Sequence, residues 1–191
     1  MRLKLHQYLL VMITSAGIAS FSCGRSTVEA GRDTTLTPRQ VLSMDDQNFL
    51  SNAHKTAIRQ KALAQGALAK SQNADVVEFA RRIVRERDVD LARLTSLLNA
   101  KNMNPQPALM QETQLEAANR LSRLNDGALD HEFVSLLAAE EQDVVRQFDR
   151  AVYTAADLDV RSYAAAVLPS LRQDLEMATE LEKNLTGNAN S

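Results

Sequence analysis

Residues 75–98 read DVVEFARRIVRERDVDLARLTSLL, and this stretch decides the fold. Its apolar residues recur at the three- and four-residue spacing of one helix face, while charged residues fill the positions between them. The inward face consists of Val76, Ala80, Ile83, Leu91, Leu94 and Leu98. We therefore predict a long amphipathic helix that begins at a cap at Asn73 or Asp75 and ends near Lys101.

Three further segments have the same periodicity, over about Asp45–Lys70, Leu129–Ala155 and Asp157–Leu185. Their predicted inward faces are Phe49, Ala53, Ala57, Ala64 and Ala67; Phe133, Leu137, Val144, Phe148 and Val152; and Tyr163, Val167, Leu171, Ala178 and Leu181. Pro169 lies inside the last segment, where we expect it to kink the helix or to leave a gap in its hydrogen bonding.

The connections are short except for one. Residues 102–107 (NMNPQP) break the second helix, a shorter helix over about 111–125 bridges to the third, and Asp126-Gly127 turns the chain. No segment has the alternation of β-branched residues that is typical of a strand. The sequence therefore predicts an all-α four-helix bundle with a short bridging helix between its second and third long helices.

The N-terminus is built like a bacterial export signal. Arg2 and Lys4 precede an apolar run over residues 8–19, and serines stand one and three positions before Cys23. Cys23 is the only cysteine, so it cannot form an intramolecular disulfide, and a diacylglycerol on its sulfur would protect the thiol. We predict a signal peptide over 1–22 and lipidation of Cys23, which anchors the protein to a membrane.

The lipidation motif departs from its usual form. Ser20-Phe21-Ser22-Cys23 lacks the leucine of a standard lipobox, so ordinary cleavage before an unmodified Cys23 is the alternative. Gly24, rather than Asp, follows the cysteine, which favours the outer membrane in bacteria with two membranes. We expect a cell-envelope protein, either anchored on the periplasmic side of the outer membrane or secreted to the periplasm.

The rest of the chain forms one domain. Residues 23–43 are rich in Gly, Ser, Thr and charge, which is typical of a flexible tether; we place the bundle at 44–187 and a disordered tail at 188–191. The formal net charge of −2 includes the two positive charges of Arg2 and Lys4, so the mature part carries −4. This mild acidity, with both signs interspersed, argues against nucleic acid as a partner.

Each apolar face contains one polar residue near its mid-length: Gln60, Arg87, Glu141 and Asp174. An isolated buried charge costs several kcal/mol, so these groups are expected to pair with one another. Arg87 has five donors and can bind both carboxylates. In the alternative, the last face is rotated so that Leu175 points inward in place of Asp174.

A family resemblance rests on short motifs in a shared order and spacing. They are Phe49-Leu50, Val76, Phe79-Ala80, Phe148 and Leu168-Pro169-x-Leu171. Across about Asp45–Leu181 the chain resembles the domain of unknown function 4142 family of bacterial proteins. The resemblance implies export and a ferritin-like four-helix bundle, and it implies no established reaction.

The resemblance also draws attention to the four polar positions. The family pattern has a Glu on the first helix and a His on each of the other three, and these positions fall on Gln60, Arg87, Glu141 and Asp174. A Glu with three imidazoles could bind a transition metal. Arg87 puts a fixed positive charge there instead, so we expect a salt-bridge cluster and no bound metal.

Signatures of catalysis are missing from the sequence. Neither His54 nor His131 has a Glu three residues before it, as a di-iron site requires, and phosphate loops, Gly-x-Ser-x-Gly and His-Glu-x-x-His motifs are absent. Glu140-Glu141 with Asp143 could bind a hard cation, although a solvated acidic face is the alternative. We expect Arg87 to lower the pKa of Glu141 and of Asp174, and we expect neither catalytic residues nor a cofactor.

The preferred functional prediction is a non-enzymatic envelope lipoprotein, in which a tethered bundle binds another protein or a small ligand or has a structural role. The alternative is a ferritin-like metal-binding protein or one that responds to oxidative or envelope stress. Bound metal would separate the two classes. The sequence leaves the oligomeric state open.

Overall fold

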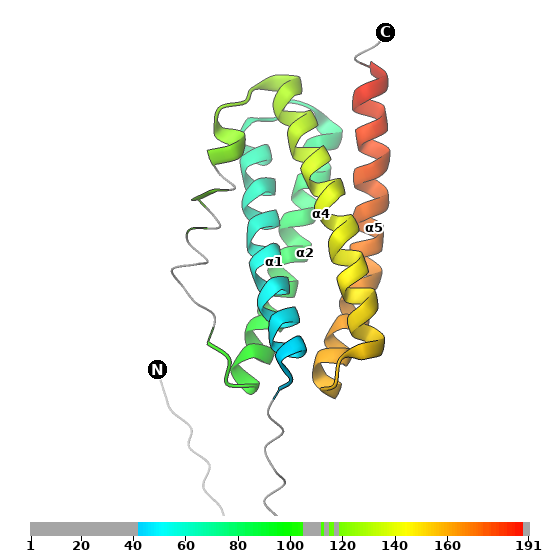
Figure 1. The fold of residues 1–191 in the computed structure, drawn as a ribbon. Coiled ribbons are helices and arrows are strands. Elements are labelled where there is room, and N and C mark those ends of the chain that lie inside the picture. Colours follow the sequence, from blue (N-terminus) through cyan, green and yellow to red (C-terminus); the bar gives the residue numbers. More distant parts are fainter. Residues whose placement is uncertain (1–41, 105–111, 113–114, 117–118, 189–191) are drawn as a thin grey trace, which may run out of the picture. The chain divides into compact units, whose positions relative to one another are not determined.

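The computed structural model describes residues 42–104, 112, 115–116 and 119–188. Within them four long helices form a bundle (Figure 1): α1 (Met44–Lys70), α2 (Ala74–Ala100), α4 (Asp126–Thr154) and α5 (Leu158–Asn188). No strand occurs in these ranges, and the predicted all-α bundle is confirmed. No helix among them is long and apolar enough to cross a membrane.

The order of the helices follows from ion pairs between them. Lys61–Asp88 joins α1 to α2, Arg59–Glu140 joins α1 to α4, and Arg82–Asp174 joins α2 to α5. Each neighbouring pair is antiparallel, so α2 and α4 run in the same direction. The end of α2 and the start of α4 therefore lie at opposite ends of the bundle (Figure 1), and a long connection between the second and third helices is the pattern of ferritin-like bundles.

The core has three layers along the bundle axis. One apolar cluster contains Leu50, Leu94, Leu98, Phe148, Val160, Tyr163 and Leu171, and a second contains Leu63, Val76, Phe79, Ile83, Phe133, Leu137 and Ala178. The four polar residues that interrupt the helix faces lie between these clusters in sequence on every helix. The bundle thus has an apolar layer on each side of a polar middle.

Most predicted inward positions are buried, but three are not fully so. Phe49 and Val152 are only partly buried and pack against the edge of the first apolar cluster, and Leu91 is also only partly buried. Leu50 and Asp90 are the buried neighbours of Phe49 and Leu91. On α2 the inward series continues from Arg87 by three residues, and this step selects Asp90 rather than Leu91.

Helix starts are set by local capping. The Ser43 hydroxyl accepts a hydrogen bond from the Asp46 amide at 3.0 Å, and the Asn73 side chain accepts one from the Asp75 amide at the same distance. The prediction that Asp126-Gly127 is a turn before the helix was wrong, because α4 already begins at Asp126. Asp126 itself takes a positive φ of 48°, a conformation that Asp tolerates better than most residues.

α5 continues through Pro169. Proline has no N–H, so the carbonyl of Ala165 lacks its usual helical donor. Both residues are exposed, so water can reach that carbonyl.

Part of the predicted bridging helix lies outside the described residues. Residues 119–122 are helical, and Leu121 packs over Gly66, where an added Cβ would meet its Cδ1 at 3.4 Å. Lys70 Nζ donates to the Ser122 carbonyl at 2.7 Å. These contacts join the second half of the bridge to α1.

The N-terminal predictions mostly lie outside the described residues. The signal peptide, Cys23 and most of the tether fall within residues 1–41, and most of the tail falls within 189–191. Leu42 and Ser43, the last residues of the expected tether, belong to the folded unit, since Leu42 is buried and Ser43 caps α1. Asn188, which we placed in the tail, is the last residue of α5.

Candidate functional site

The polar middle of the bundle brings together side chains from three helices. Arg87 from α2, Glu141 from α4 and Asp174 from α5 are exposed by 1%, 0% and 0%. Gln60 from α1 is equally buried, at 1% exposure. All four polar side chains that interrupt the apolar faces therefore point inward, and Asp174 rather than Leu175 takes the central position on α5.

A single guanidinium nitrogen joins the two carboxylates. Arg87 Nη2 donates to Glu141 Oε1 at 2.6 Å and to Asp174 Oδ2 at 2.7 Å. Hydrogen bonds between charged groups are short and strong, and a buried ion pair depends on them to offset its loss of hydration. This pairing ties α2 to both α4 and α5 at mid-length.

Arg82 extends the cluster toward the surface. Its Nε donates to Asp174 Oδ1 at 2.8 Å and its Nη2 donates to Gln173 Oε1 at 2.9 Å. With a side-chain exposure of 19%, Arg82 connects the buried Asp174 to solvent. Periodicity did not point to Arg82, because it lies beside the apolar stripe, where an arginine is ordinary.

Gln60 does not join the salt bridges. Its Nε2 has no hydrogen-bond partner among the described residues, and neither do Arg87 Nε and Glu141 Oε2. The structure therefore brings together three of the four predicted residues by direct bonds, and it places Gln60 in the same layer, where its side chain interacts with Glu140.

Burial decides the protonation behaviour of the carboxylates. Loss of hydration raises the pKa of Glu141 to about 7, and the opposing effect of Arg87 is smaller. Burial also raises the pKa of Asp174, against the lowering effects of Arg87 and Arg82. Arg87 acts on both pKa values in the direction we expected, but the net shifts are upward, because one shared nitrogen does not replace the hydration that the carboxylates lose.

A second buried polar pair was missed by the sequence reasoning. The Tyr163 hydroxyl donates to Asp90 Oδ1 at 2.8 Å, linking α2 to α5. Burial raises the pKa of Asp90, while the bond from Tyr163 and the charge of Arg87 oppose that rise. Asp90 lies three residues after Arg87 on the same face, which is a signal that helical periodicity could have used.

The polar layer does not fit a metal ion of the kind that the family pattern implies. The Arg87 guanidinium stands within hydrogen-bond distance of both carboxylates, and it carries a permanent positive charge and offers no lone pair to a metal. Nowhere in the described part of the chain do three His, Cys, Asp or Glu side chains group so as to hold one.

The acidic run on α4 does not converge on one point either. Glu140 pairs with Arg59 at 2.9 Å, Glu141 with Arg87 and Asp143 with Arg146. Each of these three carboxylates thus pairs with a different arginine. This arrangement favours neither a hard-cation site nor a freely solvated acidic face.

Comparison with known proteins gives one family. The family described as "Domain of unknown function (DUF4142)" matches residues 32–181, which include almost all of the four helices. No curated protein and no solved structure matches the chain. The match confirms the resemblance that the sequence motifs indicated, and the chain belongs to the domain of unknown function 4142 family.

Proposed function

We propose that this protein is a non-enzymatic cell-envelope lipoprotein whose helical bundle acts as a binding or structural module. The observation that carries the proposal is the bond from Arg87 Nη2 to both Glu141 and Asp174. These bonds use the charged groups of the core to hold three helices together. A structural role for the core leaves the helix surfaces as the places where the protein meets other molecules.

The burial of the cluster supports the absence of catalysis. A pKa of about 7 would suit Glu141 for general acid or base work. The Glu141 side chain is fully buried, however, and it faces the Arg87 guanidinium instead of an open cleft. A proton-transfer group must come within hydrogen-bond reach of its substrate, and the full burial of Glu141 beside Arg87 works against such an approach.

The anchoring part of the proposal rests on the sequence before α1. Cys23 follows a segment with the charge and apolar run of an export signal, and about twenty residues separate it from the folded unit. A chain of that length would hold the bundle away from the membrane surface while keeping it anchored.

The anchor is tested by lipid labelling in a bacterium with two membranes. The full chain, its Cys23→Ser variant and its Ser22→Ala variant are grown with labelled palmitate, and the cells are separated into membrane and soluble fractions. We expect label and membrane location for the original chain and for Ser22→Ala, which keeps a small residue at the cleavage site. Cys23→Ser should lose the label and move to the soluble fraction. An unlabelled, soluble original chain would overturn lipidation and leave plain secretion.

A further inference from the structure

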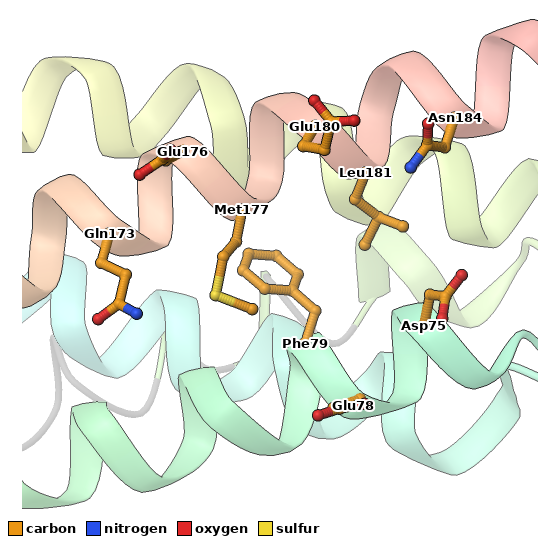
Figure 2. Close-up of a pocket in the computed structure, with 9 residues that line it drawn as sticks. All are labelled: Asp75, Glu78, Phe79, Gln173, Glu176, Met177, Glu180, Leu181 and Asn184. Carbon is orange, nitrogen blue, oxygen red and sulfur yellow. The ribbon is translucent and has the colours of Figure 1, made fainter.

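A groove lies on the bundle surface between the first turns of α2 and the second half of α5. Its volume is about 650 Å³, and its floor is made of Phe79, Met177 and Leu181. Figure 2 shows Met177 and Leu181 of α5 pointing toward Phe79 of α2, with Gln173 and Asn184 at the two ends. The floor belongs to, or packs against, the second apolar cluster of the core.

Both sides of this groove are acidic. Asp75 and Glu78 stand on the α2 side and Glu176 and Glu180 on the α5 side, and all four are exposed. The lining contains neither Lys nor Arg.

The groove has the length and the arrangement of lining residues that a helix-binding site requires. Its lining on α5 extends from Gln173 to Asn184, about 16 Å at a rise of about 1.5 Å per residue, or roughly three helical turns. The two carboxylates on α5 are four residues apart and those on α2 are three apart, so each pair lies on one helix face. Apolar residues of an incoming helix would reach the floor, while residues on its flanks would meet the carboxylates.

We propose that this groove binds an amphipathic helix of a partner protein, with an apolar face flanked by Lys or Arg side chains. The inference rests on the proposed function as a binding module and names the chemistry of the partner. Charge complementarity selects this occupant, because basic flanks neutralise the four rim carboxylates. A second copy of the chain fits poorly, since a symmetric contact would set one acidic rim against the other.

The binding test uses the full chain carrying Cys23→Ser and a fluorescent model peptide. The peptide has about 18 residues, only Leu and Lys, arranged so that the leucines form one face of a helix. A scrambled peptide of the same composition and a peptide with Glu in place of Lys serve as controls. Fluorescence anisotropy measures each Kd at several salt concentrations. We expect the amphipathic basic peptide to bind tightly, with affinity falling as salt rises, and the controls to bind at least about tenfold more weakly.

Variants of the protein locate the site. Glu176→Gln/Glu180→Gln removes two rim charges and should weaken binding about fivefold to tenfold, since each exposed ion pair contributes modestly. The matched control, Glu112→Gln/Glu116→Gln, removes an exposed pair with the same spacing outside the groove and should leave the Kd unchanged. Met177→Gln should weaken binding without any change in charge.

Three results would overturn the proposal: no binding of the amphipathic peptide, equal binding of the scrambled peptide, or equal effects of the rim and control variants. Self-association that Glu176→Gln/Glu180→Gln strengthens and Met177→Gln abolishes, measured by light scattering, would replace the partner helix with a second copy. None of these results depends on palmitate labelling at Cys23. Failure of the proposed helix binding can therefore be distinguished from failure of the proposed lipid anchor.

Discussion

Among the described residues, Arg87 is the cation that bonds to both Glu141 and Asp174, so its removal should be costly. We predict that Arg87→Met lowers the free energy of unfolding by roughly 3–5 kcal/mol, because Glu141 loses its cation and Asp174 keeps only Arg82. Urea unfolding followed by circular dichroism measures the change. The exposed Arg85 lies on the same helix, and Arg85→Met should change the stability by less than about 0.5 kcal/mol.

A triple replacement tests whether stability is lost because Arg87→Met leaves two buried carboxylates with fewer cationic partners. With Glu141→Leu and Asp174→Leu added to Arg87→Met, we expect much of the lost stability to return, as it does when buried ion pairs are replaced by apolar groups. A single Arg87→Met variant as stable as the original protein would contradict the bonding described here.

Glu141 should make the stability depend on pH. Its pKa is raised by burial from 4.5 in the unfolded chain to about 7 in the folded protein, so the folded state binds the proton more tightly. The free energy of unfolding should therefore fall as pH rises from about 4.5 to 7, by at most about 1.4 kcal/mol per pH unit from this group. Below this window Glu141 is protonated in both the folded and the unfolded state and costs no stability. Above the window it is ionised in both states, and its full cost to the free energy of unfolding is present.

The comparison with Glu141→Gln isolates this contribution. The stability difference between the original protein and the variant should change across the pH window, whereas Asp143→Asn, at an exposed position on the same helix, should leave the slope unaltered. Urea unfolding at half-unit pH steps gives both slopes. A difference that stays constant with pH would mean that Glu141 has an ordinary pKa.

The polar layer could be located from the sequence because each of its members interrupts an apolar series on a helix. Arg82 could not be found in this way, because it lies beside the stripe. Asp90, three residues after Arg87, was within reach of the same reasoning, but its partner Tyr163 is on another helix and was not. The direction of the carboxylate pKa shifts was also out of reach, since it depends on how burial balances against one shared donor in three dimensions.

At the scale of helices, polar contacts join the α2 and α5 segments along their length. Lys101 pairs with Asp157 at 2.7 Å at one end, Tyr163 bonds to Asp90 farther along, and Asp174 accepts from both Arg82 and Arg87. Among these contacts, the bond between Tyr163 and Asp90 has a neutral donor, so it can be removed without adding or deleting a charge.

We predict that Tyr163→Phe lowers the free energy of unfolding by about 1–3 kcal/mol, because the buried Asp90 carboxylate loses a hydrogen-bond donor while the ring stays in place. Chemical denaturation measures the effect. Tyr153→Phe is the matched control, since this side chain is 77% exposed and its hydroxyl can bond to water. Equal effects of the two changes would show that the bond to Asp90 contributes nothing.

The helices themselves were predictable to within a few residues because each one buries a continuous apolar stripe. The start of α4 was set too late, since Asp-Gly is common in turns, whereas here Asp126 takes the positive φ and the helix begins with it. The groove between α2 and α5 was not predictable. Its carboxylates look like any exposed helix face until two helices bring them to opposite sides of Phe79.

At the scale of the molecule, the protein has a closed interior and an acidic surface. The charged groups of the core bind one another, and residues 23–191 have a formal net charge of −4, from −2 for the whole chain less the charges of Arg2 and Lys4. The interior holds a salt bridge at the position where the family pattern would place a metal.

The metal content of the purified full chain carrying Cys23→Ser tests that claim most directly. The protein is prepared without chelator or affinity tag, and mass spectrometry measures metal as isolated and after exposure to Zn²⁺, Fe²⁺ and Mn²⁺. The isosteric variant Glu141→Gln/Asp174→Asn keeps the shape of the core and removes the carboxylates. We predict far less than one metal per chain, with no difference between the two proteins. Near-stoichiometric metal that disappears in the variant would contradict the salt-bridge account and establish a metal-binding protein instead.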